Sequence, residues 1–540
     1  MASKPSKPKP FTCSFILFLV ALLLFTIYYL KQLIHDDIQN RVTYPKQSKN
    51  NINPKWFEIV ARELGHENTI NVGFVNMGVE IVQTKGTRII KVDFDPVDED
   101  NTRWSELFPE WIDESLNSRC PKIPMPRFED YRELDVVVAR VPFEEGGGRS
   151  VFRLQVNLVV ANLLVRSGRK GNEVGRPIFA VFIGPTGPMW ELFRCDDLLW
   201  HVGDTWVYKP ELRRIKQKVL MPVGSCQISP PFAKSGEELW RRKSDVSKTN
   251  SIYQPREAYV TVLHSSEAYV CGAIALAQSI IRSNSTKDLV LLADRHISPQ
   301  SIDGLQSAGW KVKQIQRIRS PRSKKNAYNE WNYSKLRIWQ LIEYDKLMFI
   351  DSDLIVTRNV EEFFVHPQIS AAGNDRHIFN SGLMLVEPSM CTFETLMKKR
   401  FSVESYNGGD QGFLNEMFPW WHRLPAKLNQ LKFFGSAQDH VHQIPHDTYT
   451  VHYLGLKPWL CYKDYDCNWD KMETQLFASD SAHEKWWSIY DSMPKKLKRF
   501  CSLTPKIDGR IHKYRQIAKD ARFHDGHWKI EVKDERRDSM

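Results

Sequence analysis

The sequence lacks the features that mark fibrous, disordered and nucleic-acid-binding proteins. Only 27 of its 540 residues are Gly and 29 are Pro, which excludes a collagen-like or low-complexity chain. Hydrophobic residues make up 42% and charged residues 26%, the composition of a folded globular protein. The net charge is only +11, and no long run of Lys and Arg occurs, so we expect no nucleic-acid partner. At roughly 150 residues per domain, the length predicts two or more domains.

The N-terminal hydrophobic segment lacks the small-residue cleavage site of a secretory signal peptide. Residues 11–30 contain no charge, and as a helix they would span about 30 Å, enough to cross a bilayer core. Lys4, Lys7 and Lys9 precede this segment, so the positive-inside rule places residues 1–10 in the cytosol. The segment is also longer than the apolar core of a cleaved signal, which is the alternative interpretation. We therefore predict a cytosolic tail (1–10), a transmembrane signal anchor (11–30), a polar stem (31–55) and a lumenal body.

The cysteines show no zinc-binding pattern. Eight of the nine lie beyond the predicted anchor, where an oxidising lumen would allow disulfides. Cys461 and Cys467 are the favoured local pair, but eight cysteines permit 105 pairings and the sequence does not choose among them.

Residues 56–235 form the first lumenal region, and it has no phosphate-binding loop. Gly146-Gly147-Gly148 is not followed by Lys and Ser or Thr, so a hairpin turn is the better interpretation. Apolar runs at 134–141, 151–165 and 177–183 predict strands, which together indicate a small β-rich region of unknown role. Residues 236–256 are charged and irregular, as in a linker.

Strands and helices alternate from residue 257 onward. Strands are expected at 259–263, 288–293, 311–318 and 346–350, and helices at 268–281, 298–308 and 334–344. This order predicts parallel pairing in a Rossmann-like α/β domain over 257–500, followed by a charged tail at 501–540. Ligands in such sheets bind at the carboxyl ends of the strands, which places Asp351 and Leu263 at one edge.

Asp351 and Asp353 end an apolar strand and are separated by one residue. Side chains at that spacing in an extended chain point the same way, so the two carboxylates repel unless a cation neutralises them. Hard oxygen ligands suit Mg²⁺ or Mn²⁺. The alternative is a solvated turn, because two acids at this spacing occur by chance in many proteins.

Three further segments, 379–382, 407–412 and 452–459, carry polar groups beside apolar runs or helix starts. An imidazole from His452 would complete a shell with the two aspartates and favour Mn²⁺ over Ca²⁺. Lys457 and the Gly455 backbone are suited to grip phosphates. Each segment also has a structural interpretation: Asn380 as a strand cap, Asp410 as a helix cap, and His452 as a core histidine.

Together these segments, in this order over residues 257–470, resemble glycosyltransferase family 8, the family of glycogenin and the galactinol synthases. Residues 190–200, 221–227 and 452–469 resemble its plant xylan glucuronosyltransferase branch. The resemblance implies a GT-A fold, a UDP-sugar donor, Mn²⁺ as cofactor and retention of the anomeric configuration. It also implies a Golgi enzyme that takes UDP-glucuronate as donor and xylan as acceptor, with other cell-wall synthesis enzymes as further partners.

The resemblance implies roles for individual residues. Asp351, Asp353 and His452 match the metal ligands, and Asp410, Gln411 and Lys335 match residues that act on the donor. The remaining donor-binding positions, with Lys335 among them, are Leu263, Ser265, Ser266, Tyr269, Ser352, Asn380, Ser381, Asn407, Gly455 and Lys457.

The chain departs from glycogenin at Asn407, where glycogenin has an aspartate near the donor sugar. Two like charges about 4 Å apart cost about 4 kcal/mol at an effective dielectric near 20, which would reject a uronic acid. An amide removes this repulsion and can donate a hydrogen bond to a carboxylate. We therefore expect Asn407 to help admit UDP-glucuronate. Candidate cationic partners for the donor carboxylate are Arg322, Arg337 and Arg376, with surface solvation as the alternative for each.

Two mechanisms and three functions stay open at this point. Retention can proceed by double displacement, with Asp410 or Gln411 nearest as nucleophile, or by front-face attack guided by the leaving diphosphate. The favoured reaction is transfer of α-glucuronosyl to O-2 of xylose in xylan. The alternatives are a family 8 transferase for another UDP-sugar, such as a self-glucosylating primer, and a catalytically silent membrane-anchored scaffold.

Overall fold

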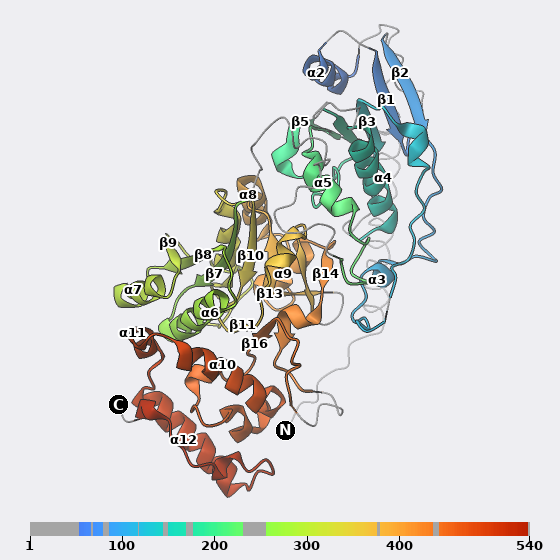
Figure 1. Ribbon diagram of the computed structural model, residues 1–540. Helices are drawn as coiled ribbons and strands as arrows, with labels where there is room; N and C mark the ends of the chain where they lie inside the picture. The colour runs from blue at the N-terminus through green and yellow to red at the C-terminus, as the bar shows by residue number, and fades with distance from the viewer. Residues whose placement is uncertain are drawn as a thin grey trace, which may run out of the picture. The chain divides into compact units, whose positions relative to one another are not determined.

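The computed structural model describes residues 53–65, 69–78, 86–116, 118–143, 149–168, 177–230, 255–374, 378–435 and 442–537 (Figure 1). The predicted cytosolic tail, anchor, triple-glycine turn and nearly all of the stem and linker lie outside these residues. Within the part of the chain that is described, no helix has the length and apolar character that crossing a membrane requires.

The first region, residues 56–235, contains a six-stranded sheet in the described residues. Its strand order is β2-β1-β3-β4-β6-β5, with β2, β1, β3 and β4 parallel and β6 and β5 antiparallel. The strands are β1 Ile70–Val75, β2 Thr87–Val92, β3 Val136–Arg140, β4 Phe179–Ile183, β5 Leu198–Val202 and β6 Thr205–Tyr208. The helices are α2 Lys55–Leu64, α3 Trp104–Leu107, α4 Val151–Ser167 and α5 Leu212–Val219.

The strand expected at 151–165 is wrong, because this segment is helix α4. Ser150 caps the helix by accepting a hydrogen bond from the Arg153 backbone N–H. Nearly every residue of α4 is buried, so its sequence shows no polar face, and an apolar run without periodicity fits a buried strand or a buried helix equally well. Val137 and Ala139 of β3 belong to the same core as α4, whereas Val136 and Val138 face α2. The region is therefore an α/β layer rather than simply β-rich.

The second sheet has seven strands in the described residues, in the order β14-β12-β13-β10-β7-β8-β9. Its strands are β7 Glu257–Leu263, β8 Asp288–Asp294, β9 Lys311–Ile315, β10 Lys346–Ile350, β12 Ser370–Gly373, β13 Phe379–Val386 and β14 His422–Leu424. The parallel pairing expected for the first four is confirmed, since β10, β7, β8 and β9 are parallel neighbours. β13 runs antiparallel to β10, which breaks the Rossmann-like pattern.

Helices cover both faces of the seven-stranded sheet. They are α6 Val270–Arg282, α7 Pro299–Ser307, α8 Met390–Lys399 and α9 Asp410–Met417, with the 3₁₀ helices η5 Glu267–Tyr269 and η6 Asn332–Gln340. Met348 and Ile350 of β10 pack in the core that contains α6, and Leu347 and Phe349 pack in the core that contains η6 and α9. Burial on both faces explains why β10 reads as an unbroken apolar run. The helix expected at 334–344 is present as the tighter, shorter η6.

A third, small sheet and the C-terminal helices complete the fold. The sheet contains β11 Leu354–Val356, β15 Gln430–Leu431 and β16 Thr450–His452, preceded by the 3₁₀ helix η8 Ala426–Asn429. The C-terminal helices are α10 Asp480–Ser492, α11 Lys495–Lys498 and α12 Pro505–Asp520.

Residues 501–537 are folded, in contrast to the charged tail expected from their composition. Arg536 is buried and donates hydrogen bonds to the backbone carbonyls of Trp459 (3.1 Å) and Cys501 (3.1 Å). Its guanidinium also pairs with Asp534 at 2.6 Å. Arg536 thus ties the C-terminal segment to main-chain oxygens far away in the sequence. The charge composition of this segment does not reveal such a structural role.

All eight cysteines beyond residue 100 form disulfides. The expected pair Cys461–Cys467 is confirmed. The other pairs, which the sequence left open, are Cys120–Cys226, Cys195–Cys391 and Cys271–Cys501. Cys195–Cys391 joins the first region to helix α8. Beside it, Arg194 donates to Glu387 at 2.9 Å in a nearly buried ion pair.

Candidate active site

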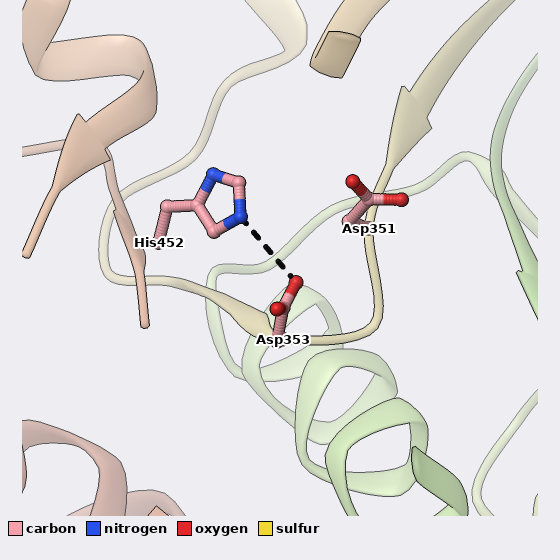
Figure 2. Close-up of side chains that lie close together, drawn as sticks. All are labelled: Asp351, Asp353 and His452. Carbon is pink, nitrogen blue, oxygen red and sulfur yellow. Dashed lines mark ion pairs between the residues drawn. The ribbon is translucent and has the colours of Figure 1, made fainter. Parts of the chain in front are cut away.

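Asp351, Asp353 and His452 lie together beside the carboxyl end of β10. The chain leaves β10 at Asp351, turns, and enters β11, which pairs antiparallel with β16 so that Leu354 lies opposite His452. This register brings the imidazole beside the turn, as Figure 2 shows. One ligand atom from each of the three side chains lies within 4.8 Å of the others, and His452 Nε2 is 3.5 Å from Asp353 Oδ1. The structure thus brings together the three residues expected to bind a metal.

Two glycines allow the close packing around this turn. A Cβ on Gly382 would lie 2.6 Å from His452 Cε1, so only glycine lets the imidazole pack on β13. A Cβ on Gly272 of α6 would lie 2.4 Å from the Ser352 carbonyl oxygen. Ser352, expected to contact the donor, is itself buried beneath the turn. The turn is therefore fixed from the helix side and the imidazole from the sheet side.

The acidic groups meet two lysines. Lys335 Nζ lies 2.5 Å from Asp410 Oδ2 and 3.4 Å from Asp351 Oδ1. Lys457 Nζ lies 2.7 Å from Asp353 Oδ2. Burial lowers the pKa of both lysines, but their carboxylate neighbours outweigh it and raise the pKa, so both stay cationic.

The two metal-site carboxyls differ in their pKa. Burial raises the pKa of Asp351 to about 6, assisted by the neighbouring Asp353 and opposed by Lys335. Burial acts in the same direction on Asp353, but Lys457 and His452 outweigh it and lower its pKa. A divalent cation would offset both the burial and the neighbouring Asp353 charge that raise the pKa of Asp351. Two carboxylates and one imidazole also form a hard, mixed O/N ligand set, so the residues present fit a divalent metal.

Asp410, Ser381 and Gln411 form a second group beside Lys335. Ser381 Oγ donates to Asp410 Oδ2 at 2.9 Å, and the Ser381 backbone N–H donates to Gln411 Oε1 at 3.1 Å. Gln411 Nε2 in turn donates to the hydroxyl of Tyr406 at 2.7 Å. Burial raises the pKa of Asp410, but Lys335 more than offsets it, so the carboxyl is ionised. The expected donor-sugar residues are therefore adjacent and held in defined orientations.

The residues expected to bind the nucleotide part of the donor lie at the carboxyl ends of β7, β8 and β9. Leu263 is buried, Ser266 caps η5, and Tyr269 packs edge-on against Trp459. Ser265 adopts a left-handed backbone conformation (φ 69°), and such strain in a non-glycine residue concentrates at functional sites.

Residues missed from the sequence surround Ser265. Its backbone N–H donates to Asp294 Oδ2 at 3.3 Å, and Arg317 donates to its hydroxyl at 3.0 Å. His296 also contacts Asp294, at 2.9 Å. Asp294 is the last residue of β8, so its place at the carboxyl end of a parallel strand is the signal that could have found it.

Other expected site residues have structural contacts. Asn407 Oδ1 accepts from the backbone N–H groups of Gly409 (2.9 Å) and Gly412 (3.3 Å), which forms the start of α9. Gly455 has a left-handed φ of 74°, and a Cβ there would lie 2.5 Å from Asn468 Oδ1. Asn380 Oδ1 accepts from the Gly382 backbone N–H.

The arginines proposed as carboxylate partners make structural hydrogen bonds where they are described, and several tryptophans are buried. Arg337 bonds Gln316 and Gln340, Arg322 bonds the Phe401 carbonyl, and Arg376 lies outside the described residues. Aromatic rings can stack on sugars, but five tryptophans of this domain are buried in the cores: Trp420, Trp421, Trp459, Trp486 and Trp487.

Comparison with known proteins gives two family matches. Residues 45–226 match the GUX1-5 N-terminal domain, and residues 260–462 match glycosyl transferase family 8. UDP-glucuronate:xylan alpha-glucuronosyltransferase 2 of Arabidopsis thaliana is 47% identical over 500 residues, covering 89% of this chain and 82% of that protein. This chain belongs to glycosyltransferase family 8, with the xylan alpha-glucuronosyltransferases. The resemblance inferred from its motifs is confirmed.

Two further relatives show how the likeness is distributed along this family 8 glycosyltransferase. UDP-glucuronate:xylan alpha-glucuronosyltransferase 1 of Arabidopsis thaliana is 45% identical over 464 residues, covering 83% of this chain and 68% of that protein. Glycogenin-2 of Homo sapiens is 28% identical over 283 residues, covering 48% of this chain and 56% of that protein. Likeness to the xylan enzymes thus extends through the first region, beyond the glycosyltransferase domain.

Proposed function

We propose that this enzyme transfers α-glucuronosyl from UDP-glucuronate to O-2 of xylose in xylan with retention, using Mn²⁺. The observation that carries this proposal is the 47% identity to a UDP-glucuronate:xylan alpha-glucuronosyltransferase over 89% of the chain. The site supports it, because Asp351, Asp353, His452, Lys335 and Asp410 all lie in one cluster. A silent scaffold would have no need to keep these five groups together.

The site residues have separate tasks in this reaction. Asp351, Asp353 and His452 would hold the cation, which supplies positive charge for the diphosphate leaving group. Lys335 and Lys457, both kept cationic by their carboxylate neighbours, stabilise negative charge as the sugar leaves. The Ser381 hydroxyl donates to Asp410, and the Ser381 backbone N–H donates to Gln411. Ser381 and Gln411 are thus positioned beside Asp410 to orient the donor sugar.

Selection of a uronic acid donor is assigned to Asn407. Its Oδ1 is occupied at the start of α9, whereas its Nδ2 has no hydrogen-bond partner among the described residues. Nδ2 is thus available to donate to a carboxylate. Asn407→Asp keeps the Oδ1 acceptor and replaces only this donor by a negative charge, which makes it a matched test.

The test measures transfer by the full-length chain. Incubation with UDP-glucuronate, UDP-glucose or UDP-galactose, Mn²⁺ and xylo-oligosaccharides, with product masses, should show glucuronosyl transfer as the fastest reaction. Asn407→Asp should shift kcat/KM toward UDP-glucose by about 10²–10³-fold, the equivalent of about 4 kcal/mol. Faster transfer from another UDP-sugar by the wild type would overturn the donor assignment, and unchanged selectivity in the variant would overturn the role of Asn407.

The cellular setting is proposed as a single-pass Golgi membrane protein with residues 31–540 lumenal, in contact with other cell-wall synthesis enzymes. Support comes from the uncharged segment 11–30 and from the four disulfides, which form in oxidising compartments. Asn284, in an exposed Asn-Ser-Thr glycosylation site, gives a direct test. We expect the wild type to carry an N-glycan that a glycosidase removes and that Asn284→Gln lacks. We also expect residues 31–540 to be protected from added protease in intact vesicles. Digestion of these residues in intact vesicles would refute this topology.

A further inference from the structure

A chain of buried amides connects His452 to the backbone of β13. His452 Nδ1 lies 3.1 Å from Asn429 Oδ1, and Asn429 Nδ2 donates to Asn380 Oδ1 at 3.0 Å. Asn380 Oδ1 also accepts the Gly382 backbone N–H at 2.8 Å. His452, Asn429 and Asn380 are each at least nine-tenths buried.

The direction of every hydrogen bond in this series of side chains follows from the Gly382 backbone N–H at its end. A backbone N–H can only donate, so the atom of Asn380 that faces Gly382 must be the amide oxygen. Asn429 must then present its NH₂ group to Asn380 and its own oxygen to His452. That oxygen can only accept, so His452 must carry its proton on Nδ1. Nε2, the nitrogen nearest Asp353, is left with a lone pair.

The imidazole has no other orientation that keeps these contacts. Cε1 of His452 packs where a Cβ on Gly382 would stand, and the His452 carbonyl accepts the Lys432 backbone N–H at 3.0 Å. Rotating the ring by half a turn would place a carbon against Asn429 Oδ1 and lose that bond. On the far side, Asn380 Nδ2 donates to Asn374 Oδ1 at 2.8 Å, which fixes the Asn380 amide as well.

We propose that Asn429 and Asn380 are positioning residues that preset His452 as a metal ligand. A neutral imidazole beside a carboxylate would otherwise place its proton on Nε2 and donate it to Asp353, which would block the metal. The amide chain prevents this by supplying the acceptor for Nδ1–H, and its direction is set by the Gly382 backbone. Asn380 thereby supports the metal site from behind. This inference rests on the proposed binding of a divalent cation by Asp351, Asp353 and His452.

The test measures Mn²⁺ affinity without donor, by electron paramagnetic resonance titration of the full-length protein. Asn429→Leu keeps the side-chain shape and removes both hydrogen bonds, so affinity should fall about 10–100-fold, the usual effect of losing an outer-shell partner. Asn157→Leu is the matched control, because Asn157 is a buried amide in α4 that also makes two hydrogen bonds, to Arg153 and Met189. It should lower the melting temperature without changing Mn²⁺ affinity.

A second pair of variants decides the matter if Asn429→Leu does not fold. Asn380→Asp keeps an oxygen acceptor for Gly382 and Asn429, so Mn²⁺ affinity should be retained. Asn380→Leu removes the acceptor, frees the Asn429 amide to turn over, and should lower affinity about tenfold or more. Equal affinities in this pair, or wild-type affinity in Asn429→Leu, would overturn the inference. Failure of the wild type itself to bind Mn²⁺ would instead overturn the proposed metal site.

Discussion

The two large sheets of this enzyme share a parallel core but differ at their strand ends. In the seven-stranded sheet, β10 ends in the Asp351–Asp353 turn, and β7 and β8 end near Ser265 and Asp294. In the six-stranded sheet, the ends of β1 and β3 are joined by the Asn76 side chain, whose Nδ2 donates to the Arg140 carbonyl oxygen at 3.0 Å. Among the described residues, only the first edge gathers a group of metal-ligating side chains. Parallel sheets provide the edge, but the residues placed there decide whether it is a site.

The two regions also differ in the pKa of a buried lysine. Lys335 lies between carboxylates that raise its pKa, against the effect of burial. Lys218, in the first region, has no hydrogen-bond partner for Nζ among the described residues, and burial lowers its pKa to about 8 in spite of nearby Glu191. The first lysine is held as a cation where the reaction would need one, and the second is a packing residue over the ring of Trp420.

The strongest test of the comparison removes the ion pair that joins the two regions. Arg194→Met removes the guanidinium that hydrogen-bonds buried Glu387 and leaves only Lys346, at 3.9 Å, as its ion-pair partner among the described residues, so the free energy of unfolding should fall by about 3–5 kcal/mol. Arg166→Met, which removes an exposed pair with Glu129, should leave the unfolding midpoint unchanged. Urea unfolding of both variants measures this. Equal losses would mean that the Arg194 pair does not couple the regions.

The next test compares the two lysines in catalysis. Lys335→Met should lower kcat by about 10²–10³-fold, because it removes a preorganised charge at the reacting groups. Lys218→Met should leave kcat unchanged, since Lys218 lies in the first region among packing residues. Steady-state kinetics on folded protein checks both. A large loss of kcat in Lys218→Met would contradict the separation of roles.

A smaller effect is expected from packing behind the metal-site turn. Gly272→Ala would press a methyl group into the Ser352 carbonyl and Trp459, at a cost of about 1–3 kcal/mol in unfolding free energy and with a raised KM for the donor. Gly509→Ala is the control, because a Cβ there meets nothing within 4 Å in helix α12 and should stabilise by about 0.5–1 kcal/mol. Thermal unfolding measures both changes, and a neutral Gly272→Ala would show that the turn yields.

The smallest expected effect is a pH dependence. Folded Lys218 releases its proton near pH 8, whereas the unfolded chain keeps it until about 10.5, so in that window the unfolded state binds more protons. Stability of the wild type relative to Lys218→Met should therefore rise with pH, by about 1 kcal/mol per pH unit between pH 8 and 10. Chemical denaturation at several pH values would show this slope. No slope would mean that Lys218 is solvated.

Sequence reasoning found most of the catalytic sheet and missed the helix of the first region. Strands β7, β8 and β10 were predictable because burial on both faces leaves unbroken apolar runs followed by polar residues. The same kind of run at Val151–Ser167 forms helix α4, and its 17 residues, longer than most strands, were the available hint. The C-terminal residues were misjudged because the contacts that bury Arg536 join segments far apart in sequence.

The chemical groups of this enzyme are legible from its residue pattern: two acids after an apolar strand, a distant histidine, and two lysines. How these groups meet depends on the folded chain. The antiparallel register of β11 and β16 carries His452 to Asp353, and η8 places Asn429 behind the imidazole. Local sequence specifies which side chains leave a strand, because that depends on neighbours along the chain. Which distant side chain stands opposite them depends on pairing between strands nearly 100 residues apart, which no local pattern encodes.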